Sequence, residues 1–278
     1  MHKQHPKKQI SSFLRSKRAL AIPVTYLILF VSLITVISAT YSFAVAKISA
    51  RGAVLRASVA KQNMQLLDNA VHSVAWGFGA SKVVYMDDCG GDFQTATTAK
   101  RLVINLTDEQ TFSDVLFNSS LGKAFYKLEA SEFSYDNEFL RGDERTIINQ
   151  SSFSTTQLYV ATEDAKQLVL CYRPLVTVAI VGMSNGKPLN LIRIHVINLN
   201  SSQNLMISQK FYLKATARDV ATATSQYEFN SSTGSLAVKA DLDGVTSVVW
   251  IPISSNSSGA VVTVEVVVSN VRIQEAEA

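Results

Sequence analysis

The chain has 278 residues, of which 47% are hydrophobic and 17% charged, with 26 basic and 22 acidic side chains. Six of the basic residues and no acid lie within residues 1–19, so the remainder carries 20 basic against 22 acidic groups. The positive net charge therefore comes from the N-terminal tail, and we expect no nucleic-acid-binding surface.

Residues 1–18 form a basic tail, and residues 19–46 follow as 28 positions without a charge. A membrane core about 30 Å thick needs roughly 20 apolar residues in a helix, so this segment predicts a transmembrane helix. Because a short basic flank is retained in the cytoplasm, we expect a single-pass cell-membrane protein with an extracellular C-terminal domain. The lipid bilayer is its first expected partner.

Residues 47–79 predict an amphipathic helix that continues the span and stops at Gly77 and Gly79. Apolar residues recur along it at intervals of four or seven positions. The expected apolar stripe consists of Ile48, Leu55, Val59, Leu66, Ala70 and Val74. We expect this stripe to pack against the chain's own head domain or against neighbouring helices.

Residues 80–278 predict a β-sheet head. After an irregular connection over 81–100, the period of the apolar pattern changes to two, which is typical of strands. The predicted strands are 101–107, 123–134, 157–162, 167–173, 175–182, 189–198, 205–216, 235–241, 246–253 and 260–274. The fold class is therefore α+β: a long N-terminal transmembrane and amphipathic helix followed by an all-β antiparallel sandwich head, with a division into two subdomains left open.

Two cysteines, Cys89 and Cys171, lie 82 positions apart, and no Cys-x-x-Cys pair occurs. In an extracellular compartment they predict one disulfide, with two buried free thiols as the alternative. Asn-x-Ser/Thr sequons are candidate glycosylation sites and fit an exported surface. The six acceptors are Asn105, Asn118, Asn149, Asn200, Asn230 and Asn256.

The N-terminal residues Lys17-Arg18-Ala19 and Ile22-Pro23-Val24 precede a hydrophobic helix, an amphipathic helix and a β head. This arrangement resembles the archaeal type IV pilin-like proteins, which include pilins and archaellins. The resemblance implies a prepilin-type signal, cut by a prepilin peptidase between Ala19 and Leu20, with the helix retained. It also implies a pilin-like subunit or accessory component of a type IV pilus-like filament, associating with itself or with other pilin-like subunits through the N-terminal helix.

Other functions are open at this point. Ala44-Val45-Ala46 matches a signal-peptidase site, so a secreted or anchored β-sandwich binding or adhesion module with a cleaved signal peptide is the alternative. A surface hydrolase is less favoured, because His72 and His195 are the histidines outside the tail and no GxSxG, HExxH or phosphate-binding glycine loop occurs. We expect no enzyme, no metal and no cofactor.

Overall fold

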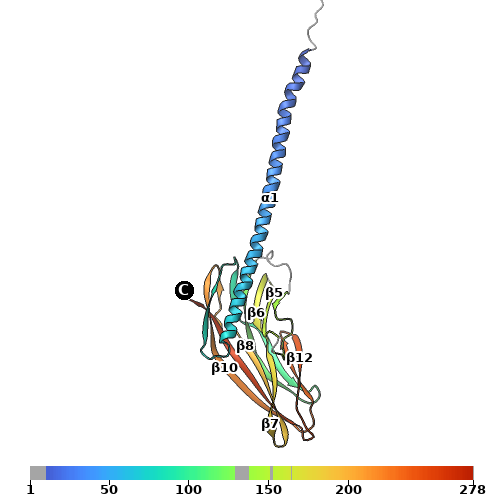
Figure 1. Cartoon of the computed structure of the whole chain (residues 1–278), viewed down its shortest axis with the longest axis vertical. Helices are drawn as coiled ribbons and strands as arrows, with labels where there is room; N and C mark the ends of the chain where they lie inside the picture. Colours follow the sequence, from blue (N-terminus) through green and yellow to red (C-terminus); the bar gives the residue numbers. More distant parts are fainter. Residues whose placement is uncertain (1–10, 129–137, 151–152, 164, 278) are drawn as a thin grey trace, which may run out of the picture. The chain divides into compact units, whose positions relative to one another are not determined.

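The computed structural model of the chain describes residues 11–128, 138–150, 153–163 and 165–277. Contacts divide the chain into two units, residues 1–52 and 53–278. The N-terminal part of helix α1 (Ser11–Val74) belongs to the first unit, and the rest of α1 belongs to the second unit together with the strands (Figure 1). The second unit therefore begins at Ala53, inside the predicted amphipathic helix, whereas the predicted head begins at residue 80.

Helix α1 ends where the glycines predicted. The Gly77 N–H donates to the Val74 carbonyl at 2.9 Å, and Gly79 has a φ of 74°, a left-handed conformation that glycine adopts without a Cβ clash. At its other end the helix begins at Ser11, so residues 11–18 of the predicted tail are helical.

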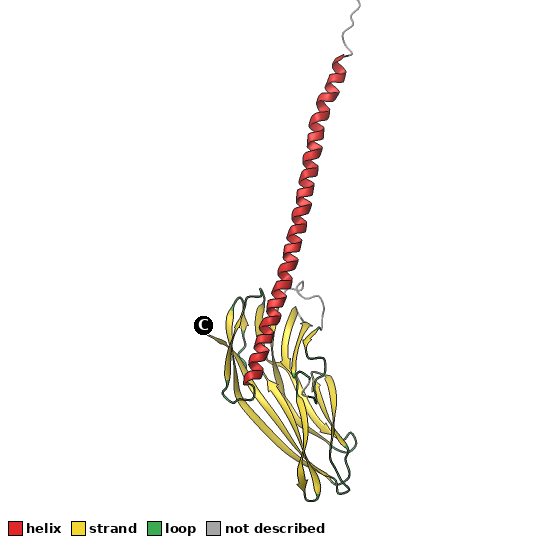
Figure 2. Ribbon diagram, viewed as in Figure 1, coloured by secondary structure: helices red, strands yellow, loops and turns green. Residues whose placement is uncertain are grey.

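The strands form two sheets (Figure 2). The first sheet has the order β1-β10-β13-β8-β7, which are Ser81–Met86, Phe211–Phe229, Ala260–Ala276, Lys187–Asn198 and Leu175–Ser184. The second has the order β12-β11-β2-β3-β6-β5-β4, which are Val245–Pro252, Ser235–Leu242, Asp92–Thr107, Ser113–Lys127, Lys166–Tyr172, Thr156–Thr162 and Phe139–Arg141. Strand β9 (Met206–Ile207) pairs with β2 beside this path.

The α+β class with a β-sandwich head is confirmed, with three corrections. Strand β13 pairs with β8 in parallel register, so the head is not wholly antiparallel. The connection expected over 81–100 contains β1 and the first part of β2, and β10 extends to Phe229 instead of ending at 216.

Two buried clusters fill the second unit, and β8 contributes to both from opposite faces. Ile192, Ile194 and Val196 lie in a cluster between the two sheets, the sheet core, as their alternation predicted. Ile197 lies in a second cluster that includes α1, the helix core. Because side chains alternate across a strand, one strand supplies apolar groups to two different surfaces.

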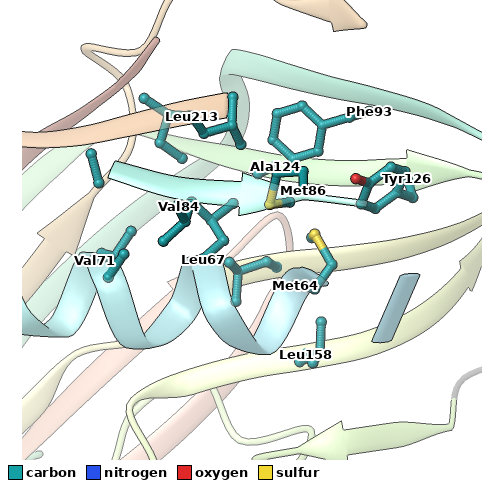
Figure 3. Packing of buried hydrophobic residues seen from close by; sticks show 14 of the residues in the cluster. Met64, Leu67, Val71, Val84, Met86, Phe93, Ala124, Tyr126, Leu158 and Leu213 are labelled. Atoms are coloured by element: carbon teal, nitrogen blue, oxygen red, sulfur yellow. The ribbon is translucent and has the colours of Figure 1, made fainter. Parts of the chain in front are cut away.

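The buried face of α1 is not the predicted stripe. Most of the apolar residues that α1 buries are spaced alternately by four and three positions. They are Ala53, Ala57, Ala60, Met64, Leu67, Val71 and Val74. In Figure 3, Met64, Leu67 and Val71 face a layer that includes Met86 and Tyr126.

Half of the predicted stripe instead faces outward, and Val59 is half-buried against the helix core. Ile48, Leu55 and Leu66 are 71%, 66% and 41% exposed, whereas Ala70 and Val74 are buried. Ala53, Ala57 and Ala60 on the buried face let the helix backbone approach the surrounding strands closely. The stripe chosen by its period therefore begins on an exposed side of the helix and reaches the buried side only at Ala70 and Val74.

Candidate functional site

The first candidate site is the uncharged part of α1. Every described side chain from Pro23 to Arg51 is exposed, and the segment has a mean hydropathy of 2.1 over its most apolar window. Within the described residues, α1 is the one helix long and apolar enough to cross a membrane by length and composition. Such a surface requires a cover other than water.

Three hydroxyl groups on this segment are satisfied inside the helix. Thr35 donates to the Val31 carbonyl at 2.8 Å, and Thr40 donates to the Val36 carbonyl at 2.8 Å. Ser32 donates to the Leu29 carbonyl at 2.9 Å. In hydrocarbon an unsatisfied polar group is costly, so this internal bonding is compatible with a lipid environment.

The second candidate site is a buried carboxylate that joins α1 to the second sheet. Asp68 is 0% exposed and forms an ion pair with Arg141 at the end of β4. Its Oδ1 accepts hydrogen bonds from the hydroxyls of Thr156 (2.7 Å) and Tyr172 (3.0 Å), which lie on β5 and β6. A buried carboxylate needs several donors of this kind, and here all of them come from outside the helix.

His72 completes this arrangement one turn further along α1. Its Nε2 lies 2.8 Å from Thr156 Oγ1 and 3.4 Å from Asp68 Oδ1. Because Thr156 gives its hydroxyl hydrogen to Asp68, its oxygen is left to accept from His72 Nε2–H. Burial lowers the pKa of His72; the Asp68 charge opposes this shift and the Arg141 charge adds to it.

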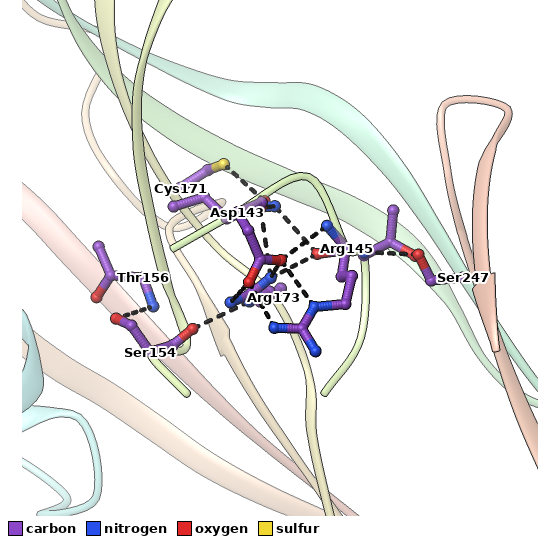
Figure 4. A network of polar contacts seen from close by, with 9 residues as sticks. Asp143, Arg145, Ser154, Thr156, Cys171, Arg173 and Ser247 are labelled. Carbon is purple, nitrogen blue, oxygen red and sulfur yellow. Dashed lines mark hydrogen bonds and ion pairs between the residues drawn. The ribbon is translucent and has the colours of Figure 1, made fainter. Parts of the chain in front are cut away.

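A neighbouring network holds the segment that carries Arg141 (Figure 4). The side chain of Arg173 is 0% exposed and pairs with Asp143, and it also donates to the carbonyls of Ser154 and Arg145. Hydrogen bonds from Arg145 and Arg173 hold the pKa of Asp143 well below its usual range. The guanidinium of Arg173 is thus engaged by the protein, and it fixes the chain between β4 and β5.

A pocket of about 310 Å³ lies next to both networks. Its lining residues are His72, Trp76, Thr155, Arg173, Leu175, His195 and Ile197. Trp76 and His195 meet edge to face with ring centroids 5.2 Å apart, and burial lowers the pKa of His195. Among the described residues, no three His, Cys, Asp or Glu side chains are grouped to hold a metal.

The pocket brings together His72 and His195, which lie far apart in the sequence. The sequence analysis treated them separately and did not identify Asp68 as a buried anchor. A signal was present, because Asp68 is the single acidic residue between Ser11 and Val74 and has a histidine four positions later. An isolated charge on an otherwise apolar helix face is rarely buried without a partner.

The two cysteines are free thiols, which is the alternative left open beside a disulfide. Cys89 and Cys171 are both buried thiols and are not bonded to each other. Cys171 Sγ lies 3.6 Å from Gln157 Oε1 on the paired strand β5, whereas Cys89 belongs to the helix core beside Tyr126. Burial raises the pKa of the Cys171 thiol, which keeps it protonated and unreactive.

The sequons differ in how accessible they are. Asn118, Asn149 and Asn230 are exposed, whereas Asn105, Asn200 and Asn256 are half-buried. The Asn105 Oδ1 atom is buried on β2, and Asn256 uses its Nδ2 to donate to the Gly186 carbonyl at 2.8 Å. We therefore expect any glycans at the three exposed acceptors first.

Ala19 and Leu20, the predicted cleavage positions, lie within α1 as a continuous helix. Cleavage between them stays a prediction. Comparison with known proteins finds no matching family model, no matching curated protein and no matching solved structure.

Proposed function

We propose that this chain is a pilin-like structural protein of the cell surface, anchored in the membrane by residues 19–46 with its β head outside. The observation that carries the proposal is the uncharged, exposed helix, in which Ser32, Thr35 and Thr40 bond internally. Its basic N-terminal flank would stay in the cytoplasm, which orients the head outward.

The head is adapted to carry a helix. Residues 57–74 of α1 contribute to the helix core, and Asp68 links them to β4, β5 and β6. A load applied along the helix would therefore pass into both sheets through packed side chains and buried hydrogen bonds. This rigid attachment suits a structural subunit.

The exposed side of the same helix part supports self-association. Val54, Leu55 and Leu66 are exposed although they are large and apolar. In a bundle of copies such residues pack between helices, and other pilin-like subunits could occupy the same positions. A prepilin peptidase acting between Ala19 and Leu20 would leave this helix intact.

The alternative function, a secreted binding or adhesion module, requires cleavage after Ala46. Removing residues 1–46 would still leave the whole helix core in place, because its first helical member is Ala57. The two functions therefore differ in the fate of the apolar segment and not in the fold of the head.

Electron microscopy of sheared cell-surface material, labelled with an antibody to the head, tests the filament role. Labelled filaments are expected, together with chain that stays in carbonate-washed membranes. The double substitution L55Q/L66Q should reduce filaments without lowering the melting temperature of the head, since both side chains are exposed. If the chain occurs only as a membrane monomer, the filament role is wrong and the anchor remains; if it is wholly soluble, both are wrong.

A further inference from the structure

The two edges of the first sheet are open over stretches of similar length. At one edge, β1 pairs with β10 only from Phe211 to Thr216, so among the described strands the outer side of β10 is unpaired from Asp219 to Phe229. At the other edge, Ile148 bridges to Leu175, which leaves the outer side of β7 open from Thr177 to Ser184.

Neither open stretch carries a charge or a proline at the edge. Residues 177–184 of β7 and 220–227 of β10 contain no charged residue and no proline. Natural proteins usually place lysine, proline or a β-bulge on exposed edges to prevent pairing with another chain, and of these features β7 has only a bulge between Ile180 and Gly182. On β10, Asp219 and Glu228 stand just outside the uncharged stretch and therefore delimit it.

The side chains on β7 add an apolar surface to the open backbone. Ile180 and Met183 are 67% and 64% exposed, and Val181 is also exposed. On β10, Ala221 to Gln226 are all exposed and small or polar, so a partner strand meets no bulky obstruction there. The β7 edge is thus apolar, and the β10 edge carries small or polar side chains.

Strand direction makes the two edges compatible with each other. Strand β10 is antiparallel to β13, β13 is parallel to β8, and β8 is antiparallel to β7. Strands β7 and β10 therefore run in the same direction. A second copy shifted sideways without inversion would present its β7 to the outer side of β10 as a parallel strand.

We infer that the first sheet is an interface between copies of this chain, in which residues 177–184 of one copy pair with residues 220–227 of the next. The contact joins two different surfaces, so each added copy leaves one new open edge at each end. It therefore produces rows of heads. The inference rests on the proposed function for its biological setting, but its geometry concerns the head alone.

Cysteine cross-linking of the full-length chain in its membrane tests the inference. Ile180→Cys on β7 and Ala223→Cys on β10 are introduced separately and together, and a short bismaleimide is added. The double variant should give a ladder of multimers, and the two single variants should cross-link only when co-expressed. Cys89 and Cys171 are buried, so the wild-type chain is the background control.

A matched control uses the other sheet. Val248 is an exposed apolar residue on β12, the edge strand of the second sheet, so Val248→Cys combined with Ala223→Cys should give no ladder. A second cysteine pair, Ile180→Cys with Thr222→Cys, should give the same ladder and leaves position 223 free for substitution. Adding Ala223→Lys to this pair should remove the ladder, whereas adding Val248→Lys should leave it.

The inference is wrong if the Val248 control cross-links as strongly as the Ile180 variant, or if Ile180→Cys links only to other proteins. It is also wrong if the ladder is absent while the chain still multimerises through α1. In that last case the proposed function stands, because the effect of L55Q/L66Q on filaments does not depend on the sheet edges.

Discussion

The Tyr172 hydroxyl donates to the Asp68 carboxylate across 3.0 Å, joining β6 to α1 over 104 positions of sequence. Thr156 and Arg141 contact the same carboxylate, so one buried group connects three strands to the helix. The helix attachment therefore depends on a polar centre as well as on apolar packing.

Asp68→Ala should destabilise the head, because it strands the buried hydroxyls of Tyr172 and Thr156 at about 1–3 kcal/mol each. The measurement is the free energy of unfolding in urea, with the protein in detergent. Asp219→Ala is the matched control, since Asp219 is exposed and accepts one bond from Asn270 at 3.1 Å. Equal losses in the two variants would show that Asp68 does not anchor the helix.

Leu66 and Leu67 are neighbours on α1 with opposite surroundings, 41% and 0% exposed. Leu67→Ala should lower the free energy of unfolding by about 2–5 kcal/mol, because it opens a cavity in the helix core. Leu66→Ala should change it by less than about 0.5 kcal/mol. A larger loss of stability for Leu66→Ala than for Leu67→Ala in thermal or urea unfolding would support the stripe predicted from sequence.

Gly142 lies between Arg141, which pairs with Asp68, and Asp143, which pairs with Arg173. Its φ is 79°, and a Cβ there would lie 2.4 Å from the Thr156 carbonyl oxygen. Gly142→Ala should therefore combine a left-handed backbone cost of about 1–2 kcal/mol with a steric clash against β5.

Gly186→Ala isolates the backbone part of that effect, because Gly186 has a φ of 78° and no neighbour within 4 Å of its Cβ position. The melting temperature should fall further for Gly142→Ala than for Gly186→Ala. Similar shifts for both variants would mean that the turn between β4 and β5 moves freely.

Acidification should destabilise the head in two separate steps. Burial lowers the pKa of both His72 and His195 from 6.5, so the unfolded chain takes up protons before the folded one does. Stability is therefore full above pH 6.5 and decreases as the pH falls toward the lowered values. Asp143, with its lowered pKa, adds a further loss only below pH 3.8.

Melting temperatures recorded between pH 8 and pH 4 test the histidine step. The double variant H72Q/H195Q should flatten the change in melting temperature between pH 7 and pH 5. Each single variant, H72Q or H195Q, should flatten it in part. A wild-type melting temperature that is constant from pH 7 to pH 5 would contradict the histidine contribution.

The sequence predicted the elements whose signal is local. An uncharged run, a glycine stop and the alternation of Ile192, Ile194 and Val196 each depend on nearby residues, and all three are found in the structure. Strand β1 was missed because its neighbours, the aspartates and glycines of residues 87–92, resemble a loop. The parallel β13–β8 pair could not be predicted, since no local pattern records which strands meet.

The helix attachment shows a different limit. Size and period pointed to Leu55 and Leu66, but the buried face is built on Ala53, Ala57 and Ala60. Which face of a helix is buried depends on how closely its partner approaches, and that is a tertiary property. Asp68 was hidden for the same reason, because its donors lie more than 70 positions away.

The intact mass of the chain purified from cell membranes tests the central claim, that the apolar helix is retained as an anchor, most directly. The predicted result is the mass of a chain that starts at Leu20 or of the full-length chain from Met1, because both forms keep residues 23–46. A chain that starts at Lys47 would contradict the anchor and establish a cleaved signal peptide.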